Sequence, residues 1–136
     1  MLRNDTDVAI YCNRELLSCV DVSTLGKDIQ SRLFFDSASN NYLVLLSGNH
    51  KTIGVLISSD GSHSRFYLEQ EISRSSCFYK NTLYYMIGDI IYFYNVIDGT
   101  KKDFHSQFAA DDCLIERKAN RFVICSNDKA YMYIKS

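Results

Sequence analysis

Residues 83–99 read LYYMIGDIIYFYNVIDG, and this stretch decides the fold of the chain. Two runs of five apolar residues, 83–87 and 90–94, flank the pair Gly88-Asp89. A Gly-Asp pair between apolar runs is a strong signal for a β-hairpin, because glycine adopts positive φ without a Cβ clash. Neither run alternates between apolar and polar residues. Such runs are typical of strands that are covered on both faces.

Three more hairpins resemble this one. They begin near Val8, Tyr42 and Phe122, so the four starting points, with Leu83, are 34, 41 and 39 residues apart. A strand repeat of about 40 residues predicts propeller-like blades, because one such unit cannot bury both of its faces alone. Most glycines fall at the turns of these units, which supports the repeat: Gly26, Gly48, Gly61, Gly88 and Gly99.

The repeat assigns most of the chain to strands. Segment 25–35 has apolar residues at helical spacing, but it is short and contains Gly26, so a strand is favoured over a helix there. The expected inner strands are 8–12, 16–22, 42–46, 52–57, 83–87, 90–94, 122–125 and 130–134, with hairpin turns at Asn13-Arg14, Gly48-Asn49, Gly88-Asp89 and Asn127-Asp128. More polar segments are expected to add last strands at 64–69 and 102–108 and first strands at 76–79 and 113–117.

These hairpins, and the phrases YNVIDGTKK at 94–102 and VDVSTLGK at 20–27, resemble the β-propeller superfamily in the broad sense that covers tryptophan-aspartate and kelch repeats. The resemblance implies an all-β fold of three to four consecutive antiparallel blades, in a single repeat domain spanning residues 1–136. A β-sandwich or a meander barrel is the alternative. The chain lacks a Trp-Asp pair, a Gly-His pair and the kelch double glycine, so no subfamily is indicated.

The number of blades is small for a propeller, because such folds typically have four to eight blades of four strands each. Strand 2–6 is therefore expected either to complete the last unit and close a ring, or to leave an open partial propeller that a partner completes.

The composition does not point to nucleic acid or membrane. The chain has 15 basic and 16 acidic side chains and a net charge of −1, whereas nucleic-acid binding usually leaves a basic excess. Residues 1–7 are polar and no apolar run exceeds five residues, whereas a bilayer-spanning helix needs about twenty. We therefore expect an intracellular protein, cytoplasmic or nuclear, that does not contact a membrane.

No motif carries catalytic or metal chemistry. The five cysteines have irregular spacing without a CxxC pair, and most of them lie in apolar strands, where we expect them to behave as small buried hydrophobes. His50, His63 and His105 have no acidic or Cys partner at metal-ligand spacing. The cluster Ser59-Asp60-Gly61-Ser62-His63 is explained by turn formation, because a catalytic triad needs converging members and an oxyanion hole. The sequence thus predicts no enzyme, no metal and no cofactor.

The function predicted from this pattern is a non-enzymatic protein-interaction scaffold, a subunit of a larger assembly. Edge strands are expected to recruit a protein partner, or a second copy of the chain. The alternative is an RNA- or ribonucleoprotein-associated factor that uses basic and aromatic side chains. In either case the candidate interaction surface consists of Lys101, Lys102, Arg117, Lys118 and Arg121.

Overall fold

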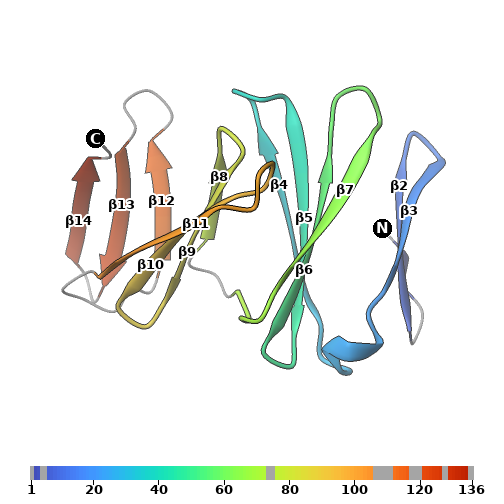
Figure 1. Ribbon diagram of the computed structural model, residues 1–136, viewed down its shortest axis with the longest axis horizontal. Coiled ribbons are helices and arrows are strands. Elements are labelled where there is room, and N and C mark those ends of the chain that lie inside the picture. The colour runs from blue at the N-terminus through green and yellow to red at the C-terminus, as the bar shows by residue number, and fades with distance from the viewer. Residues whose placement is uncertain are drawn as a thin grey trace. The chain divides into compact units, whose positions relative to one another are not determined.

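The computed structural model describes residues 2–3, 6–72, 76–105, 112–116, 121–126 and 129–134, and the side-chain surroundings of residues 6–72 and 76–105 (Figure 1). The described part of the chain is all-β, as the sequence predicts, with fourteen strands and one short 3-10 helix, η1 (Ser23–Leu25). No helix in this part is long and apolar enough to cross a membrane.

The strands form four antiparallel sheets in which each strand pairs with its neighbours in sequence. The first sheet contains β1 (Leu2–Arg3), β2 (Asp7–Cys12) and β3 (Glu15–Asp21), and the second contains β4 (Gln30–Asp36), β5 (Asn41–Gly48), β6 (Lys51–Ile57) and β7 (His63–Leu68). The third contains β8 (Ser76–Tyr79), β9 (Thr82–Ile87), β10 (Ile90–Asn95) and β11 (Lys101–His105), and the fourth contains β12 (Asp112–Glu116), β13 (Arg121–Ser126) and β14 (Lys129–Ile134). None of these sheets closes on itself among the described residues, so the described strands do not form a closed meander barrel.

One strand pairs differently from the expectation. The N-terminal strand β1 pairs with β2, with Leu2 opposite Ala9 and Arg3 opposite Val8, and it does not join the fourth sheet. Of the two alternatives for residues 2–6, completion of the last unit is therefore wrong, and the open partial propeller stays a prediction. The physical reason is that pairing with a strand only a few residues away closes a much shorter loop than pairing across the chain.

Three hairpin turns use residues other than glycine in the left-handed region. Both turn residues have positive φ at Asn13-Arg14 (50° and 68°), at Asn49-His50 (50° and 61°) and at Lys80-Asn81 (49° and 60°). Turns with two such residues match the right-handed twist of the strands that they join. The second hairpin therefore turns one residue later than the sequence predicts.

Gly48, expected at that turn, is instead the last residue of β5 and is paired with Lys51. A Cβ atom at Gly48 would collide with the backbone carbonyl oxygen of Leu25. Glycine is required at position 48 because η1 packs closely against β5. It is not required by a turn.

The chain divides into two compact units, residues 1–33 with 41–71, and residues 34–40 with 72–136. A single domain over 1–136 stays a prediction.

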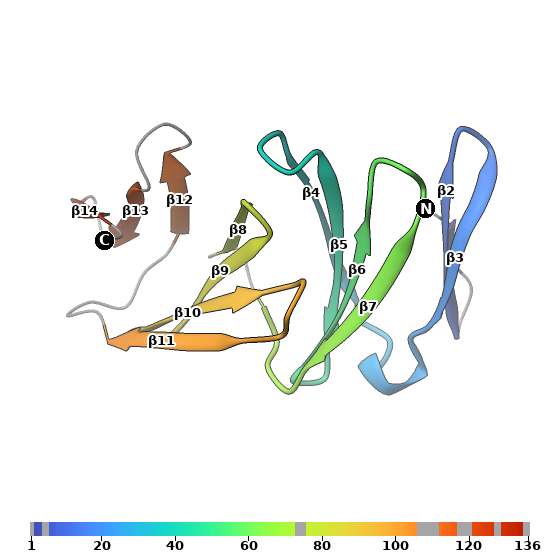
Figure 2. The ribbon, with the colours of Figure 1, turned by 45° about the horizontal axis from the view of Figure 1, so that its top comes forward.

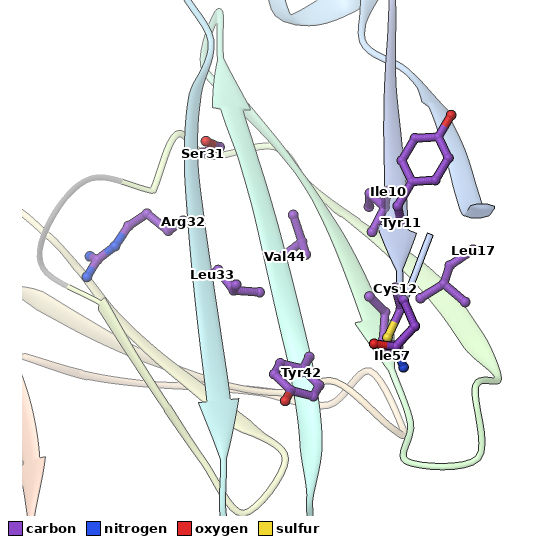
Figure 3. A pocket seen from close by; sticks show the side chains of 11 residues that line it. Ile10, Tyr11, Cys12, Leu17, Ser31, Arg32, Leu33, Tyr42, Val44 and Ile57 are labelled. Atoms are coloured by element: carbon purple, nitrogen blue, oxygen red, sulfur yellow. The ribbon is translucent and has the colours of Figure 1, made fainter. Parts of the chain in front are cut away.

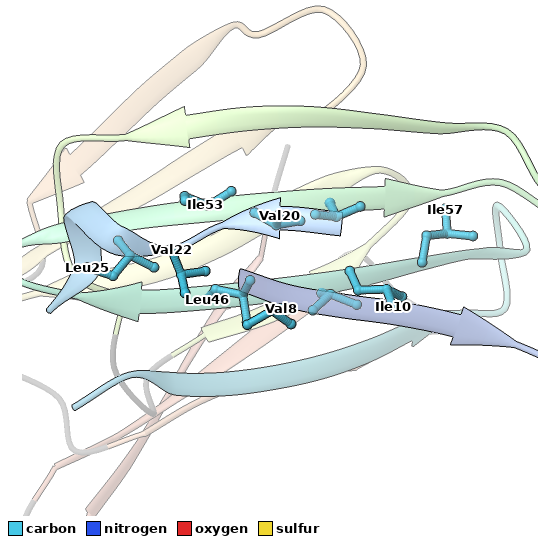
Figure 4. Close-up of a cluster of buried hydrophobic side chains, with 10 residues drawn as sticks. Val8, Ile10, Val20, Val22, Leu25, Leu46, Ile53 and Ile57 are labelled. Carbon is cyan, nitrogen blue, oxygen red and sulfur yellow. The ribbon is translucent and has the colours of Figure 1, made fainter. Parts of the chain in front are cut away.

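In the first of these units, one face of the first sheet packs on one face of the second (Figure 4). Val8 and Ile10 on β2 alternate with outward side chains, as the two-residue period of a strand requires. The other members of this core are Val20, Val22, Leu25, Val44, Leu46, Ile53, Val55 and Ile57.

The third sheet, in the second unit, has aromatic side chains on both faces. On one face the Tyr84 ring meets the edge of the Phe93 ring with centroids 5.2 Å apart, next to the buried Cys77. On the other face the fully buried Tyr85 stacks on Tyr92 with centroids 5.0 Å apart. These contacts explain why the runs 83–87 and 90–94 are apolar on both faces of the sheet.

Candidate functional site

An open cleft of about 530 Å³ lies in the first unit, between the β2–β3 hairpin and strands β4 to β6 (Figure 3). Its floor is formed by the core residues Ile10, Val44 and Ile57. Two large side chains, Leu33 and Tyr42, line it closer to solvent and form its rim, whereas the ring of Tyr11 extends away from β4 and β5 (Figure 3). We refer to Ile10, Val44, Ile57, Leu33 and Tyr42 as the apolar cleft.

The rim residues keep much of their surface in water. Leu33 is 69% exposed and Tyr42 is 44% exposed. Single exposed apolar residues are common, but a group around a hollow with an aliphatic floor indicates a binding surface.

The cleft contains few polar groups and no buried charge. Arg32 is the charged residue that lines it, and its side chain extends away from the β2–β3 hairpin in Figure 3. Asn13, Ser31 and the exposed thiol of Cys12 supply the remaining polar groups. A cleft of this kind suits an apolar guest.

A β-bulge shapes one wall of the cleft. Ile10 is opposite Ser18, but the next residue, Tyr11, is opposite Leu16, so Leu17 is an extra residue in β3. Bulges bend a strand and redirect its side chains. Here Leu17 is half-buried against the core and also lines the cleft.

The carboxylate of the buried Asp36 is held by three hydrogen bonds. It accepts hydrogen bonds from the backbone N–H groups of Ala38 (3.1 Å) and Asn81 (3.2 Å) and from the Ser39 hydroxyl. These bonds tie the end of β4 to the β8–β9 turn, which is a structural role.

The cluster around Asp60 is a turn, as the sequence predicts. The Asp60 Oδ1 atom accepts hydrogen bonds from the hydroxyl (2.6 Å) and the N–H (2.9 Å) of Ser62, and these bonds lower the pKa of the Asp60 carboxyl. Asp98 has the same arrangement with Thr100, at 2.7 Å and 2.8 Å, and its pKa is lowered for the same reason. Among the described residues, no group of three or more His, Cys, Asp or Glu side chains is placed to hold a metal ion.

The structure describes the side chains of only two members of the predicted basic surface. Lys101 and Lys102 lie exposed on the edge strand β11. Arg117 and Lys118 lie outside the described residues, and Arg121 begins β13 but its side chain is not described. The expected grouping of all five residues stays a prediction.

Lys101 does not lie beside an open aromatic face. Its ammonium group is 4.6 Å from the centroid of the Tyr92 ring, and Tyr92 is stacked on Tyr85. Because β9 and β11 flank β10 on opposite sides, Tyr85 and Lys101 cover opposite faces of the Tyr92 ring. This ring therefore offers no free face on which a nucleic-acid base could stack.

The cysteine prediction is correct for Cys77, which is buried, and wrong for Cys12 and Cys19, which are exposed. Both exposed thiols lie on the first sheet, which has three strands among the described residues. The side chains of Cys113 and Cys125 are outside the described part.

Sequence reasoning did not identify the apolar cleft. It combines Ile10 on β2 with Leu33 on β4, which are 23 positions apart, and with Tyr42 on the next strand. The one available signal was the apolar pattern of 25–35, which contains Leu33. The whole sequence matches no protein-family model, and no curated protein is significantly similar to it.

Proposed function

We propose that this chain is a non-enzymatic protein-interaction scaffold, a subunit of a larger assembly, and that it binds a partner protein through the apolar cleft. The observation that carries the proposal is the exposure of Leu33 and Tyr42 beside a floor of buried aliphatic residues. The guest is a segment of the partner that inserts apolar side chains.

The size and chemistry of the cleft support this guest. A cavity of about 150 Å³ holds one benzene ring, so about 530 Å³ has room for roughly three side chains of that size. Tyrosine is enriched at interfaces because its ring is large, rigid and polar at one end. Tyr42 would cover the guest at a small loss of conformational entropy.

The scaffold is further proposed to be propeller-like, with the four sheets as blades. Two features support this arrangement. The second and third sheets are four-stranded meanders, and each continues after its third strand with an Asp-Gly-Ser/Thr turn. In both turns, residues 60–62 and 98–100, one carboxylate oxygen accepts the same pair of hydrogen bonds.

The test is affinity isolation from the native source with a matched pair of variants. Leu33→Ser removes the most exposed rim residue, and Ile97→Ser removes an aliphatic side chain of similar exposure (63%) that is far from the cleft in sequence and does not line it. We expect Leu33→Ser to weaken binding of a specific partner by about tenfold, as removal of an interface anchor does, and Ile97→Ser to leave it unchanged. Equal recovery with both variants would overturn the proposal.

A second readout uses the thiols. The bound partner should protect Cys12 from alkylation and should leave the Cys77 thiol as inaccessible as before, with the modified peptides identified by mass spectrometry. Protection of Cys12 by a small apolar molecule, with no specific protein partner, would indicate a small-ligand site and would contradict the scaffold function.

A further inference from the structure

The first sheet lacks a strand that its neighbours in sequence possess. The hairpin β5–β6 is followed by β7 and the hairpin β9–β10 by β11, each of which adds an outer strand to its sheet. After the hairpin β2–β3, residues 22–29 are fully described and form η1 and irregular backbone, with no strand. No described strand pairs with the outer edge of β3.

Backbone groups along this edge point away from the sheet. The N–H of Val22 donates to the Thr6 carbonyl (2.7 Å), so Val22 directs its backbone groups toward the β2 side. In an antiparallel pair this direction alternates along the strand. Cys19 and Asp21 therefore direct their N–H and carbonyl groups toward the open edge.

One side chain covers part of this edge. The Arg65 guanidinium, from β7, donates to the Cys19 carbonyl (2.8 Å) and to the Ser18 hydroxyl (2.9 Å). β3 lies beside β7 in both views of the molecule (Figures 1 and 2). Arg65 is exposed, so it acts as a removable cap on one acceptor, which is a common way to protect an edge strand.

The exposed side chains of β3 indicate the charge of a partner strand. Acidic residues lie at both ends, Glu15 and Asp21, and the exposed Leu16 and Cys19 lie between them. A second copy that paired in antiparallel fashion about Ser18 would place Glu15 opposite Asp21. Like charges directly opposite each other destabilise a sheet, so a segment with basic residues is favoured over self-pairing.

The chain itself supplies two examples of such a strand. β7 reads HSRFYL and β11 reads KKDFH, so each contains basic or imidazole side chains, an aromatic residue and no proline or glycine. Both pair in antiparallel fashion with the third strand of their sheets.

We propose that the outer edge of β3 binds an extended basic and aromatic segment of a partner protein, as an antiparallel fourth strand of the first sheet. Backbone hydrogen bonds to Cys19 and Asp21 provide the pairing, and Glu15 and Asp21 select basic side chains. Arg65 releases the Cys19 carbonyl when the strand binds. This surface is separate from the apolar cleft, and the proposal does not depend on the cleft being occupied.

The experiment uses the full chain and a fluorescent peptide, acetyl-Arg-Phe-Thr-Val-Thr-Phe-Arg-amide, with binding followed by anisotropy. The control peptide has the same side chains but carries an N-methyl group on every residue, so neither of its edges can donate to a strand ladder. We expect the first peptide to bind and the control to bind at least about tenfold more weakly. Hydrogen exchange should slow at the amides of Cys19 and Asp21.

Two variants locate the site. Cys19→Pro removes an N–H that faces outward and should abolish binding while leaving the pairing with β2 intact, because proline is tolerated on a strand edge that faces solvent. Arg65→Ala should tighten binding by about fivefold, because the cap no longer competes for the Cys19 carbonyl. Circular dichroism melts of both variants confirm that the chain is folded.

Three outcomes would overturn the inference. They are absence of peptide binding, equal binding of the two peptides, and self-association of Arg65→Ala in place of peptide binding, which would assign the edge to a second copy. Leu33→Ser should leave peptide binding unchanged, so failure here is distinguishable from failure of the apolar cleft.

Discussion

Gly54 shows how strongly one residue is constrained by a neighbouring strand. It lies on β6 opposite Phe66 of β7, and a Cβ atom at this position would overlap the Phe66 ring. Phe66 is buried and covers the strand where glycine has no side chain. The sequence did not assign Gly54 to a turn. The close approach of the Phe66 ring explains why this position is glycine.

We predict that Gly54→Ala lowers the free energy of unfolding by about 1–3 kcal/mol, the usual range for overpacking a core. Urea denaturation of the purified variant measures the loss. Combining it with Phe66→Leu should recover part of that loss, because the smaller side chain relieves the overlap. Strictly additive effects of the two changes would contradict the close approach.

Tyr85 is expected to make stability depend on alkaline pH. Burial, with smaller contributions from Tyr92 and Tyr94, raises the pKa of Tyr85. In the unfolded chain this hydroxyl loses its proton near pH 10, whereas in the folded protein it keeps the proton. The unfolded state therefore binds fewer protons above about pH 10, and stability falls as pH rises.

Tyr85→Phe should flatten that fall, which denaturation curves between pH 9 and 11.5 would reveal. Tyr67→Phe, at a tyrosine that is 66% exposed, serves as the control and should keep the slope of the parent protein. Equal slopes for Tyr85→Phe and the parent would show that Tyr85 titrates normally.

At the scale of elements, the β2–β3 turn can be improved. Arg14 has φ 68°, a left-handed conformation that disfavours any residue with a Cβ atom. Arg14→Gly should therefore stabilise the first hairpin by about 1 kcal/mol, seen as a higher melting temperature. Asp89→Gly, in a turn where only Gly88 has positive φ, should give no comparable gain.

Strands could be predicted from the sequence more reliably than the cleft. A strand depends on residues that are close together in the sequence, whereas the cleft depends on residues that are far apart in it. A hairpin is specified by adjacent apolar runs and the turn between them, and β8, for example, begins and ends at the predicted residues 76 and 79. The strand favoured over 25–35 is observed at 30–36, after a 3-10 turn that the sequence did not indicate. The apolar cleft depends on which face of β4 and of the β2–β3 hairpin meet, and a single sequence does not specify that pairing.

At the scale of the whole molecule, charge bears on the RNA alternative. The chain has a net charge of −1, and the Tyr92 ring beside Lys101 is already covered on both faces. We predict no binding of single-stranded RNA at physiological salt in a fluorescence anisotropy titration. Binding that weakens steeply with added salt, and is lost in Lys101→Ala with Lys102→Ala, would instead support that alternative.

The pairing of β1 with β2 also has a consequence for synthesis on the ribosome. Each described sheet is built from consecutive strands, and the N-terminal strand finds its partner a few residues later. The pairing of β1, β2 and β3 can thus form once residue 21 has emerged, before the later sheets are synthesised. Vectorial folding can then proceed sheet by sheet, in the order in which the ribosome releases them.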